Sequence, residues 1–247
     1  MHIYVKKGLA AHASPASRGD PSASGMRTMK HAKTDAPLEA AETAADWSRA
    51  RLVTMAAGTL VFALLLVWVV RTGVTPLDAA VIEAVLPLRT DGLTVVVKQV
   101  TSLVLPPVLL AVSLAVAPFV QARHPWLYLA LGTGTASLLN SLVKLLVARP
   151  RPDEALRLAI ETSMSFPSGH TMAAMSFYGL LIYLLWRTSA GRLPGRRLWT
   201  ALLGLLILGI GLSRIYLCVH YATDVLAGVA LSLVWLSLYT KVADRLL

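Results

Sequence analysis

Long apolar stretches alternate with short polar segments through most of this chain. Six such stretches occur, and they cover residues 52–70, 103–120, 126–147, 170–186, 199–217 and 221–240. Each is close to the roughly 20 residues that a helix needs to cross the hydrocarbon core of a bilayer. Hydrophobic residues make up 56% of the 247 positions and charged residues only 15%, which is too apolar for a soluble domain. The pattern therefore predicts an all-α, polytopic membrane protein with six transmembrane helices.

Two shorter helices are expected between the first and second spans. Residues 75–78 (Thr-Pro-Leu-Asp) supply an N-cap, a proline at the first helical position and an acid in the first turn, and they open a stretch that runs to Leu86. A second short helix is expected to begin at Asp91 and to end before the proline pair 106–107. Both are too short or too polar to span, so we expect them at the membrane surface.

The N-terminal segment differs from the rest in composition. Residues 1–51 are polar and contain no apolar run that could form the core of a signal peptide. We expect them to form a disordered cytoplasmic tail, and residues 52–247 to form one membrane domain. The single cysteine, Cys218, has no second cysteine to pair with, so the fold must rest on helix packing.

Positive charge is unevenly distributed along the chain, whose formal net charge is +10. Most of the 23 Lys and Arg residues fall in four segments that are cytoplasmic if the N-terminus is inside: 1–51, 121–125, 187–198 and 241–247. This distribution agrees with the positive-inside rule, and it accounts for the basic balance without a nucleic-acid partner. The sequence thus predicts a multi-pass cell membrane protein with both termini in the cytoplasm.

The first candidate motif lies at the end of the third apolar stretch. Lys144 is near the end of this stretch, and Arg151 follows between Pro150 and Pro152. The prolines require the helix to end here and hold the backbone around Arg151 extended. Cations near a helix end are also typical of side chains that reach toward the membrane interface. This segment alone is therefore ambiguous.

The second motif, Pro-Ser-Gly-His at residues 167–170, directly precedes the fourth stretch. A helix N-terminus offers free backbone N–H groups and the positive end of the helix dipole, Ser168 adds a hydroxyl, and Gly169 allows close approach to an anion. These features indicate an anion site. Ordinary N-capping by Ser165, Ser168 or Thr171 would explain the same residues.

The third motif joins the last two stretches: Ser213 and Arg214 are followed by His220 and Asp224. Asp224 is the only acidic residue inside any of the predicted spans, and ionisable groups within a membrane are costly enough to be functional by default. His220 lies one helical turn earlier, so the carboxylate can accept a hydrogen bond from one ring nitrogen and leave the other as a nucleophile. A purely structural His–Asp pair is the alternative.

Taken together, the motifs supply three cations, a hydroxyl, two imidazoles and a carboxylate. These groups suffice to hold a phosphoryl group and to cleave it through a phosphohistidine. Of the six histidines, only His170 and His220 fall on the side expected to be outside, and both belong to the motifs.

The combined pattern resembles the type 2 phosphatidic acid phosphatase (PAP2) family, which also includes vanadium haloperoxidases. The resemblance implies a six-helix membrane fold with its active site at the outer face, and a metal-independent reaction that needs no cofactor. It implies that His220 attacks phosphorus, that Asp224 holds His220, and that His170 protonates the departing oxygen and then activates water. It also implies that the phosphoryl oxygens are bound by Lys144, Arg151, Ser168, Gly169 and Arg214.

The resemblance implies a lipid phosphate phosphatase that works within the bilayer, since a haloperoxidase of this superfamily would be soluble. An envelope lipid is favoured, with undecaprenyl diphosphate, phosphatidylglycerophosphate and phosphatidic acid as substrates of the expected type. Two alternatives stay open: a lipid phosphotransferase that uses the same phosphohistidine, and a non-enzymatic membrane protein that binds an anion. The sequence does not indicate an oligomeric state.

Overall fold

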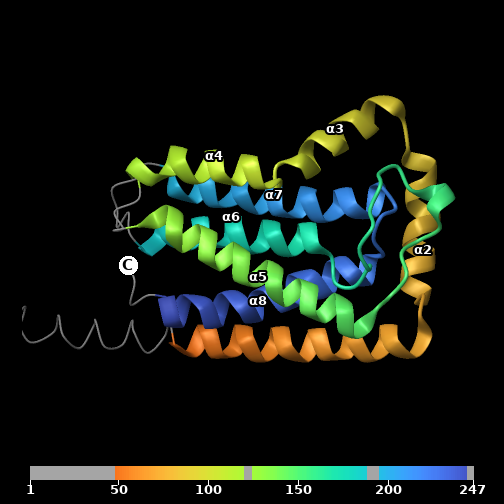
Figure 1. Ribbon diagram of the computed structural model, residues 1–247, viewed down its shortest axis with the longest axis horizontal. Coiled ribbons are helices and arrows are strands. Elements are labelled where there is room, and N and C mark those ends of the chain that lie inside the picture. Colours follow the sequence, from red (N-terminus) through yellow and green to blue (C-terminus); the bar gives the residue numbers. More distant parts are fainter. Residues whose placement is uncertain (1–47, 120–123, 188–194, 244–247) are drawn as a thin grey trace, which may run out of the picture. The chain divides into compact units, whose positions relative to one another are not determined.

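The computed structural model describes residues 48–119, 124–187 and 195–243, and every regular element in these ranges is helical (Figure 1). The prediction of an all-α fold is therefore confirmed for this part of the chain. Most of the expected tail, residues 1–51, lies outside the described residues, and the disorder of that tail stays a prediction.

The helices follow the apolar stretches of the sequence. In chain order they are Ser48–Thr72, α2 (Pro76–Val85), the 3₁₀ turn η1 (Leu86–Leu88), α3 (Asp91–Ser102), α4 (Pro106–Val116), η2 (Ala117–Phe119), α5 (Pro125–Val147), η3 (Glu154–Leu156), α6 (Gly169–Arg187), α7 (Arg196–Tyr216) and α8 (Ala222–Ala243). Within the described ranges, Ser48–Thr72, α5, α7 and α8 are long and apolar enough to cross a membrane. If α3 and α4 form one bent crossing, the number of candidate spans rises to five.

Two of the six expected spans, 103–120 and 170–186, are not among these candidates taken singly, so six crossings are not confirmed. The helix α6 covers the second of these stretches, whereas at the first the helix itself differs from the prediction. The helix found there, α4, has only 11 residues and is too short to cross a bilayer alone. It meets α3 at a break where the two axes bend by 60°. Leu105 is extended at this break because Pro106 and Pro107 exclude a helical residue before them. The sequence therefore predicts the position of the break, but it overestimates the length of the helix that follows.

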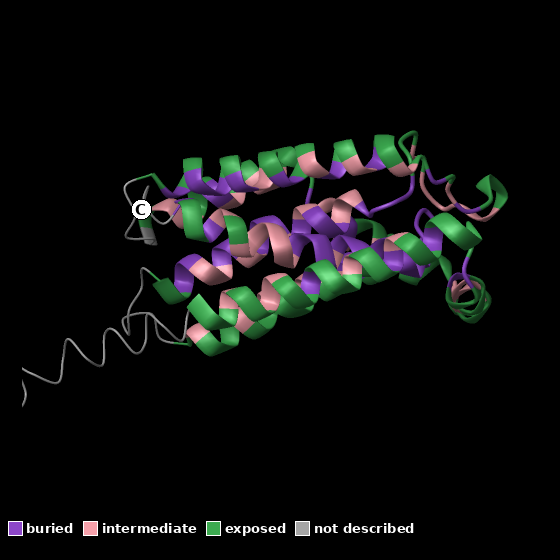
Figure 2. Cartoon of the chain, turned by 90° about the horizontal axis from the view of Figure 1, so that it is seen from below, coloured by how far each residue is buried: buried purple, intermediate pink, exposed green. Residues whose placement is uncertain are grey.

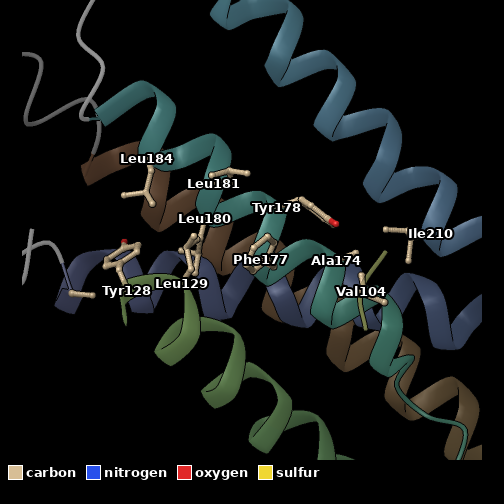
Figure 3. Packing of buried hydrophobic residues seen from close by; sticks show 11 residues of the cluster. Val104, Tyr128, Leu129, Ala174, Phe177, Tyr178, Leu180, Leu181, Leu184 and Ile210 are labelled. Carbon is tan, nitrogen blue, oxygen red and sulfur yellow. The ribbon is translucent and has the colours of Figure 1, made fainter. Parts of the chain in front are cut away.

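Helix α6 is the centre of the bundle and packs against α5, α7 and α8. Its side chains Phe177 and Leu180 are at most 2% exposed and belong to one apolar cluster with Leu129 of α5 and Ile210 of α7 (Figure 3). At Gly132 of α5, an added Cβ would lie only 2.3 Å from Leu180 Cδ1. A small residue is needed there because α5 and α6 approach closely, as is usual between membrane helices.

The outward faces of the helices are exposed and apolar (Figure 2). Leu60, Leu64 and Val70 of the first helix, and Leu145 and Leu146 of α5, are all more than 60% exposed. So large an apolar surface is unfavourable in water but matches the interior of a bilayer. The burial pattern therefore agrees with a multi-pass membrane protein.

Helix α2 lies across one end of the bundle (Figure 1). Its predicted N-terminus is confirmed: Thr75 accepts a hydrogen bond from the Asp78 N–H, and the Asp78 carboxylate accepts one from the Thr75 N–H, both at 3.1 Å. Just after η1, Arg89 donates to the carbonyls of Tyr216 and Leu156, each at 2.9 Å. These bonds fix the short helices to the end of α7 and to the loop that follows α5.

Candidate active site

The three sequence motifs meet at the end of the bundle that α2 crosses. The predicted residues lie in the last turn of α5 (Lys144), just beyond it (Arg151), around the start of α6 (Ser168, Gly169, His170), in the last turn of α7 (Arg214) and around the start of α8 (His220, Asp224). Helix α5 ends as expected, because Ala148 adopts a left-handed conformation with φ of 48°. The chain then runs through Arg151 toward α6.

His220 is held so that its two ring nitrogens face different groups. Nδ1 lies 3.4 Å from Asp224 Oδ2 and 3.4 Å from the Ser165 hydroxyl. Nε2 lies on the other side, 3.2 Å from Arg151 Nη1. Burial lowers the pKa of His220 to about 4, although Asp224 raises it in part. The ring is therefore neutral near pH 7, and Nε2 is the nitrogen that faces the Arg151 guanidinium.

Asp224 is fully buried, and all of its interactions are with polar groups of the protein. Its Oδ2 accepts hydrogen bonds from the Ser165 hydroxyl at 2.5 Å and from the Tyr221 N–H at 2.9 Å. Its Oδ1 accepts from Arg149 at 2.5 Å. A carboxylate fixed at both oxygens can set the orientation of His220 and stabilise a charged ring.

Arg149 is a residue of the site that sequence reasoning missed. Its guanidinium is buried and bridges two carboxylates, Asp224 at 2.5 Å and Asp78 of α2 at 2.6 Å. It also donates to the Thr223 hydroxyl at 2.8 Å and lies over the Tyr221 ring, 4.1 Å from the centroid. In the sequence, Arg149 is marked only by its position: it lies after the end of α5 and directly before Pro150, two residues before Arg151.

The three predicted phosphate-binding cations point toward one loop, residues 161–164. Lys144 Nζ donates to the Ser163 hydroxyl at 3.2 Å and to the Met164 carbonyl. Arg151 donates to the Ser163 carbonyl at 2.7 Å. Arg214 is almost fully buried and donates to Thr101 of α3 at 2.9 Å. Among the described residues, its Nε finds no hydrogen-bond partner, which leaves a buried donor unsatisfied.

Glu161 is a second residue that the sequence did not single out. Its Oε1 accepts a hydrogen bond from Arg214 Nη2, and its Oε2 lies 3.5 Å from Arg151 Nη2. Burial raises the pKa of Glu161, but the neighbouring basic groups, Arg214 and Arg151 foremost, together hold it below its ordinary value, so the group is ionised at neutral pH. The carboxylate thus joins two of the cations that are expected to bind phosphate.

In the Pro-Ser-Gly-His segment, Ser168 caps the start of α6 and Gly169 lies close to Lys144. Ser168 is buried, and its hydroxyl accepts from the Thr171 hydroxyl at 2.9 Å and from the Thr171 N–H at 3.5 Å, and the second of these bonds corresponds to the N-capping alternative. Gly169 lies beside α5: an added Cβ would be 3.2 Å from Asn140 Oδ1 and 4.0 Å from Lys144 Cε. A role for Ser168 and Gly169 in phosphate binding stays a prediction.

His170 opens onto a cavity of about 580 Å³. Its walls come from α3, from the break before α4, from the end of α7 and from residues 158–160, and they are largely apolar; they include Leu105, Leu158, Ile160 and Leu217. A reacting group beside His170 can therefore carry an apolar body into this cavity. Across the described residues, no cluster of three or more His, Cys, Asp or Glu side chains is arranged to hold a metal ion.

The chain is similar in sequence and in structure to known phosphatases. Residues 125–246 match the model of the PAP2 superfamily. Phosphatidylglycerophosphatase B of Bacillus subtilis is 33% identical over 177 residues, which is 70% of this chain and 87% of that protein. The crystal structure of a transmembrane PAP2-type phosphatidylglycerolphosphate phosphatase from Bacillus subtilis superposes with a TM-score of 0.70 at 29% identity, covering 78% of this chain and 98% of that one. Decaprenylphosphoryl-5-phosphoribose phosphatase of Mycobacterium tuberculosis is 36% identical over 114 residues, 45% of this chain and 57% of that protein.

Proposed function

Because this chain belongs to the PAP2 superfamily and is a membrane lipid phosphatase, we propose that it removes the terminal phosphate of an anionic envelope lipid through a phosphohistidine on His220. The observation that carries the mechanism is the orientation of His220, whose Nδ1 faces Asp224 while Nε2 faces Arg151. The nucleophilic nitrogen is therefore next to a cation that can hold the phosphoryl oxygens.

The reaction proceeds in two displacements. Nε2 of His220 attacks phosphorus while the bond from phosphorus to the lipid oxygen breaks, and His170 donates its proton to that oxygen. Neutral His170 then takes a proton from water, the water oxygen attacks phosphorus, and the phosphorus–nitrogen bond breaks to release inorganic phosphate. Lys144, Arg151 and Arg214 offset the charge on the oxygens in both steps, a task that metal ions perform in other phosphoryl-transfer enzymes.

A lipid substrate is supported by the cavity that ends at His170. The leaving group of the first step must lie beside the general acid, and here that position opens onto apolar side chains of Leu105, Leu217 and the loop at residues 158–160, with polar residues of α3 on one side. An acyl or prenyl chain fits such walls far better than a water-soluble alcohol does. The cavity therefore favours a substrate that reaches the site from the bilayer.

We place phosphatidylglycerophosphate first among the substrates. The Bacillus subtilis relative and the crystal structure described above both carry that specificity in their names. A polyprenyl phosphate is the second candidate, because the Mycobacterium tuberculosis relative acts on a decaprenylphosphoryl sugar phosphate. Undecaprenyl diphosphate and phosphatidic acid are the remaining candidates, because each also carries a terminal phosphate.

The test is phosphate release by the purified protein in detergent, with each of these lipids and with EDTA present throughout. We expect release from phosphatidylglycerophosphate to be fastest, no effect of EDTA, and no release by His220→Ala. His124→Ala is the matched control, since His124 precedes α5 at its other end and should leave the rate unchanged. Release only on addition of an acceptor lipid would indicate a phosphotransferase, and dependence on a divalent metal would contradict the mechanism.

The orientation in the membrane is part of the proposal. We propose six crossings, one of them by α6, which packs among α5, α7 and α8, and we place the site outside. In a Cys218→Ala background, Ala155→Cys should react with an impermeant thiol reagent in intact cells, whereas His124→Cys should react only after permeabilisation. Both positions are exposed. The reverse pattern would place the site in the cytoplasm.

A further inference from the structure

Glu161 stands where a phosphoryl group has to bind. Its carboxylate bridges Arg214 and Arg151, the two arginines that the mechanism assigns to the phosphoryl oxygens. A phosphoryl group cannot pair fully with both guanidinium groups while that carboxylate remains between them. Substrate binding therefore has to displace Glu161.

The loop around Glu161 allows this displacement without unfolding. It is fixed on one side by the bond from the Leu158 N–H to the Leu217 carbonyl at 3.0 Å, and on the other by the bond from the Ser165 N–H to the Arg149 carbonyl at 2.9 Å. Between these two bonds the chain is exposed, with Ile160 96% exposed. A carboxylate on such a segment can move while both ends of the loop stay in place.

The structure also offers the carboxylate a second position. A cavity of about 460 Å³ adjoins the same loop, and Glu161 and Arg157 are both among its lining residues. Arg157 donates to the Pro152 carbonyl at 2.8 Å through Nε. A displaced carboxylate would therefore still find a cation nearby, which lowers the cost of moving it.

Resting on the phosphate site described above, we propose that Glu161 competes with the phosphoryl group for Arg214 and Arg151, and so sets the affinity of the site for phosphate. Substrate displaces the carboxylate toward Arg157, and the return of the carboxylate displaces inorganic phosphate after hydrolysis. Arg214 Nε, which has no partner among the described residues, is one donor that the phosphoryl group satisfies and Glu161 does not. Glu161 is thus an affinity-determining residue rather than a catalytic one.

The test is equilibrium binding of inorganic phosphate to the purified protein in detergent, without any lipid substrate. We expect Glu161→Gln, which keeps the shape and removes the charge, to bind phosphate about tenfold more tightly than wild type, equivalent to about 1.4 kcal/mol. Glu154→Gln is the matched control, because Glu154 is an exposed acid in η3 that lines the cavity of about 460 Å³ but not the cavity at His170. It should change phosphate binding by less than about twofold, as expected for an exposed charge.

Salt separates direct competition from a distant charge effect. The tightening by Glu161→Gln should persist at about 0.5 M salt, where interactions between distant exposed charges are screened. Equal binding by wild type and Glu161→Gln, or a gain of the same size in Glu154→Gln, would overturn the proposal. Since no lipid is turned over, a failure here is distinct from a failure of the phosphatase assay: tighter phosphate binding without lipid hydrolysis would leave this inference standing and remove the proposed function.

Discussion

The two sides of the candidate site are built in different ways. On the nucleophile side, which comprises Asp78, Arg149, His220 and Asp224, every side chain is at most 4% exposed. The cation side comprises Lys144, Arg151, Glu161 and Arg214. Here Arg214 donates to Thr101 and Arg151 to the Val219 carbonyl, but the three cations also bind the Glu161 carboxylate or residues 163–164, where Met164 is 45% exposed. The nucleophile is therefore held by a fixed network, whereas the cations have, besides fixed partners, others that a phosphoryl group can replace.

The difference follows from what each side has to do. His220 needs one orientation throughout the cycle, so its supporting groups gain from permanent hydrogen bonds between α2, α8 and the segment after α5. Under the proposed mechanism the cations bind substrate and release product in each turnover, so they gain from partners that can be replaced. Substitutions on the nucleophile side should accordingly reduce turnover, while substitutions on the cation side should change affinity as well.

Asp224→Asn should have the largest effect of the substitutions that keep the shape of the nucleophile side. The amide cannot stabilise a charged His220 ring and loses its ion pair with Arg149. By analogy with the carboxylate of serine hydrolases, turnover should fall by about 10² to 10⁴. Steady-state kinetics on phosphatidylglycerophosphate measures this, and near-wild-type turnover would make Asp224 a structural residue only.

Arg149→Lys should have the next largest effect. A lysine ammonium is a point charge and cannot span Asp224 and Asp78 as the guanidinium does. We expect turnover to fall about 10- to 100-fold, as is typical when a supporting partner of a reactive group is lost, with a smaller change in KM. The matched control is Arg71→Lys, an exposed arginine at the end of the first helix, which should behave as wild type. A change in KM without a change in turnover would indicate that Arg149 acts in substrate binding, as the cations of the site do.

Arg149 also illustrates which features of the site can be predicted from the sequence and which cannot. The three motifs, the end of α5 before the prolines and the capping box of α2 are local features, and local spacing was enough to predict them. The bridge from Arg149 to Asp78 joins residues 71 positions apart. No periodicity or spacing marks such a pair, because packing of α2 against the start of α8 creates it.

Glu161 was missed for a different reason. It lies in an irregular loop that carries no motif, and its partners Arg214 and Arg151 had already been assigned to phosphate. The length of α4 was overestimated because the apolar composition begins before the break at Pro106 and continues into η2, so hydropathy alone does not mark the ends of this helix.

The smallest effect expected is that of mild acid on the protonation of His220. Burial lowers the pKa of His220 to about 4, so about nine tenths of the ring is still neutral at pH 5, whereas a histidine with the ordinary pKa of about 6.5 would be mostly charged. An NMR titration of the substrate-free protein in detergent reports this ring directly, without the proton transfer by His170. The His220 ring should show no protonation step between pH 7 and pH 5, and a step centred near pH 6.5 would show that His220 is not buried in solution.

The central claim is that Nε2 of His220 takes the phosphoryl group, and it can be tested by trapping. Wild-type protein is mixed with substrate labelled in its terminal phosphate, quenched in alkaline detergent, digested and analysed by mass spectrometry for the site and the ring nitrogen that carry the label. We predict an acid-labile, base-stable phosphohistidine at His220, bonded through Nε2, and no label in His220→Ala. Label on His170, label on Nδ1 of His220, or equal labelling of the His220→Ala variant would contradict the account.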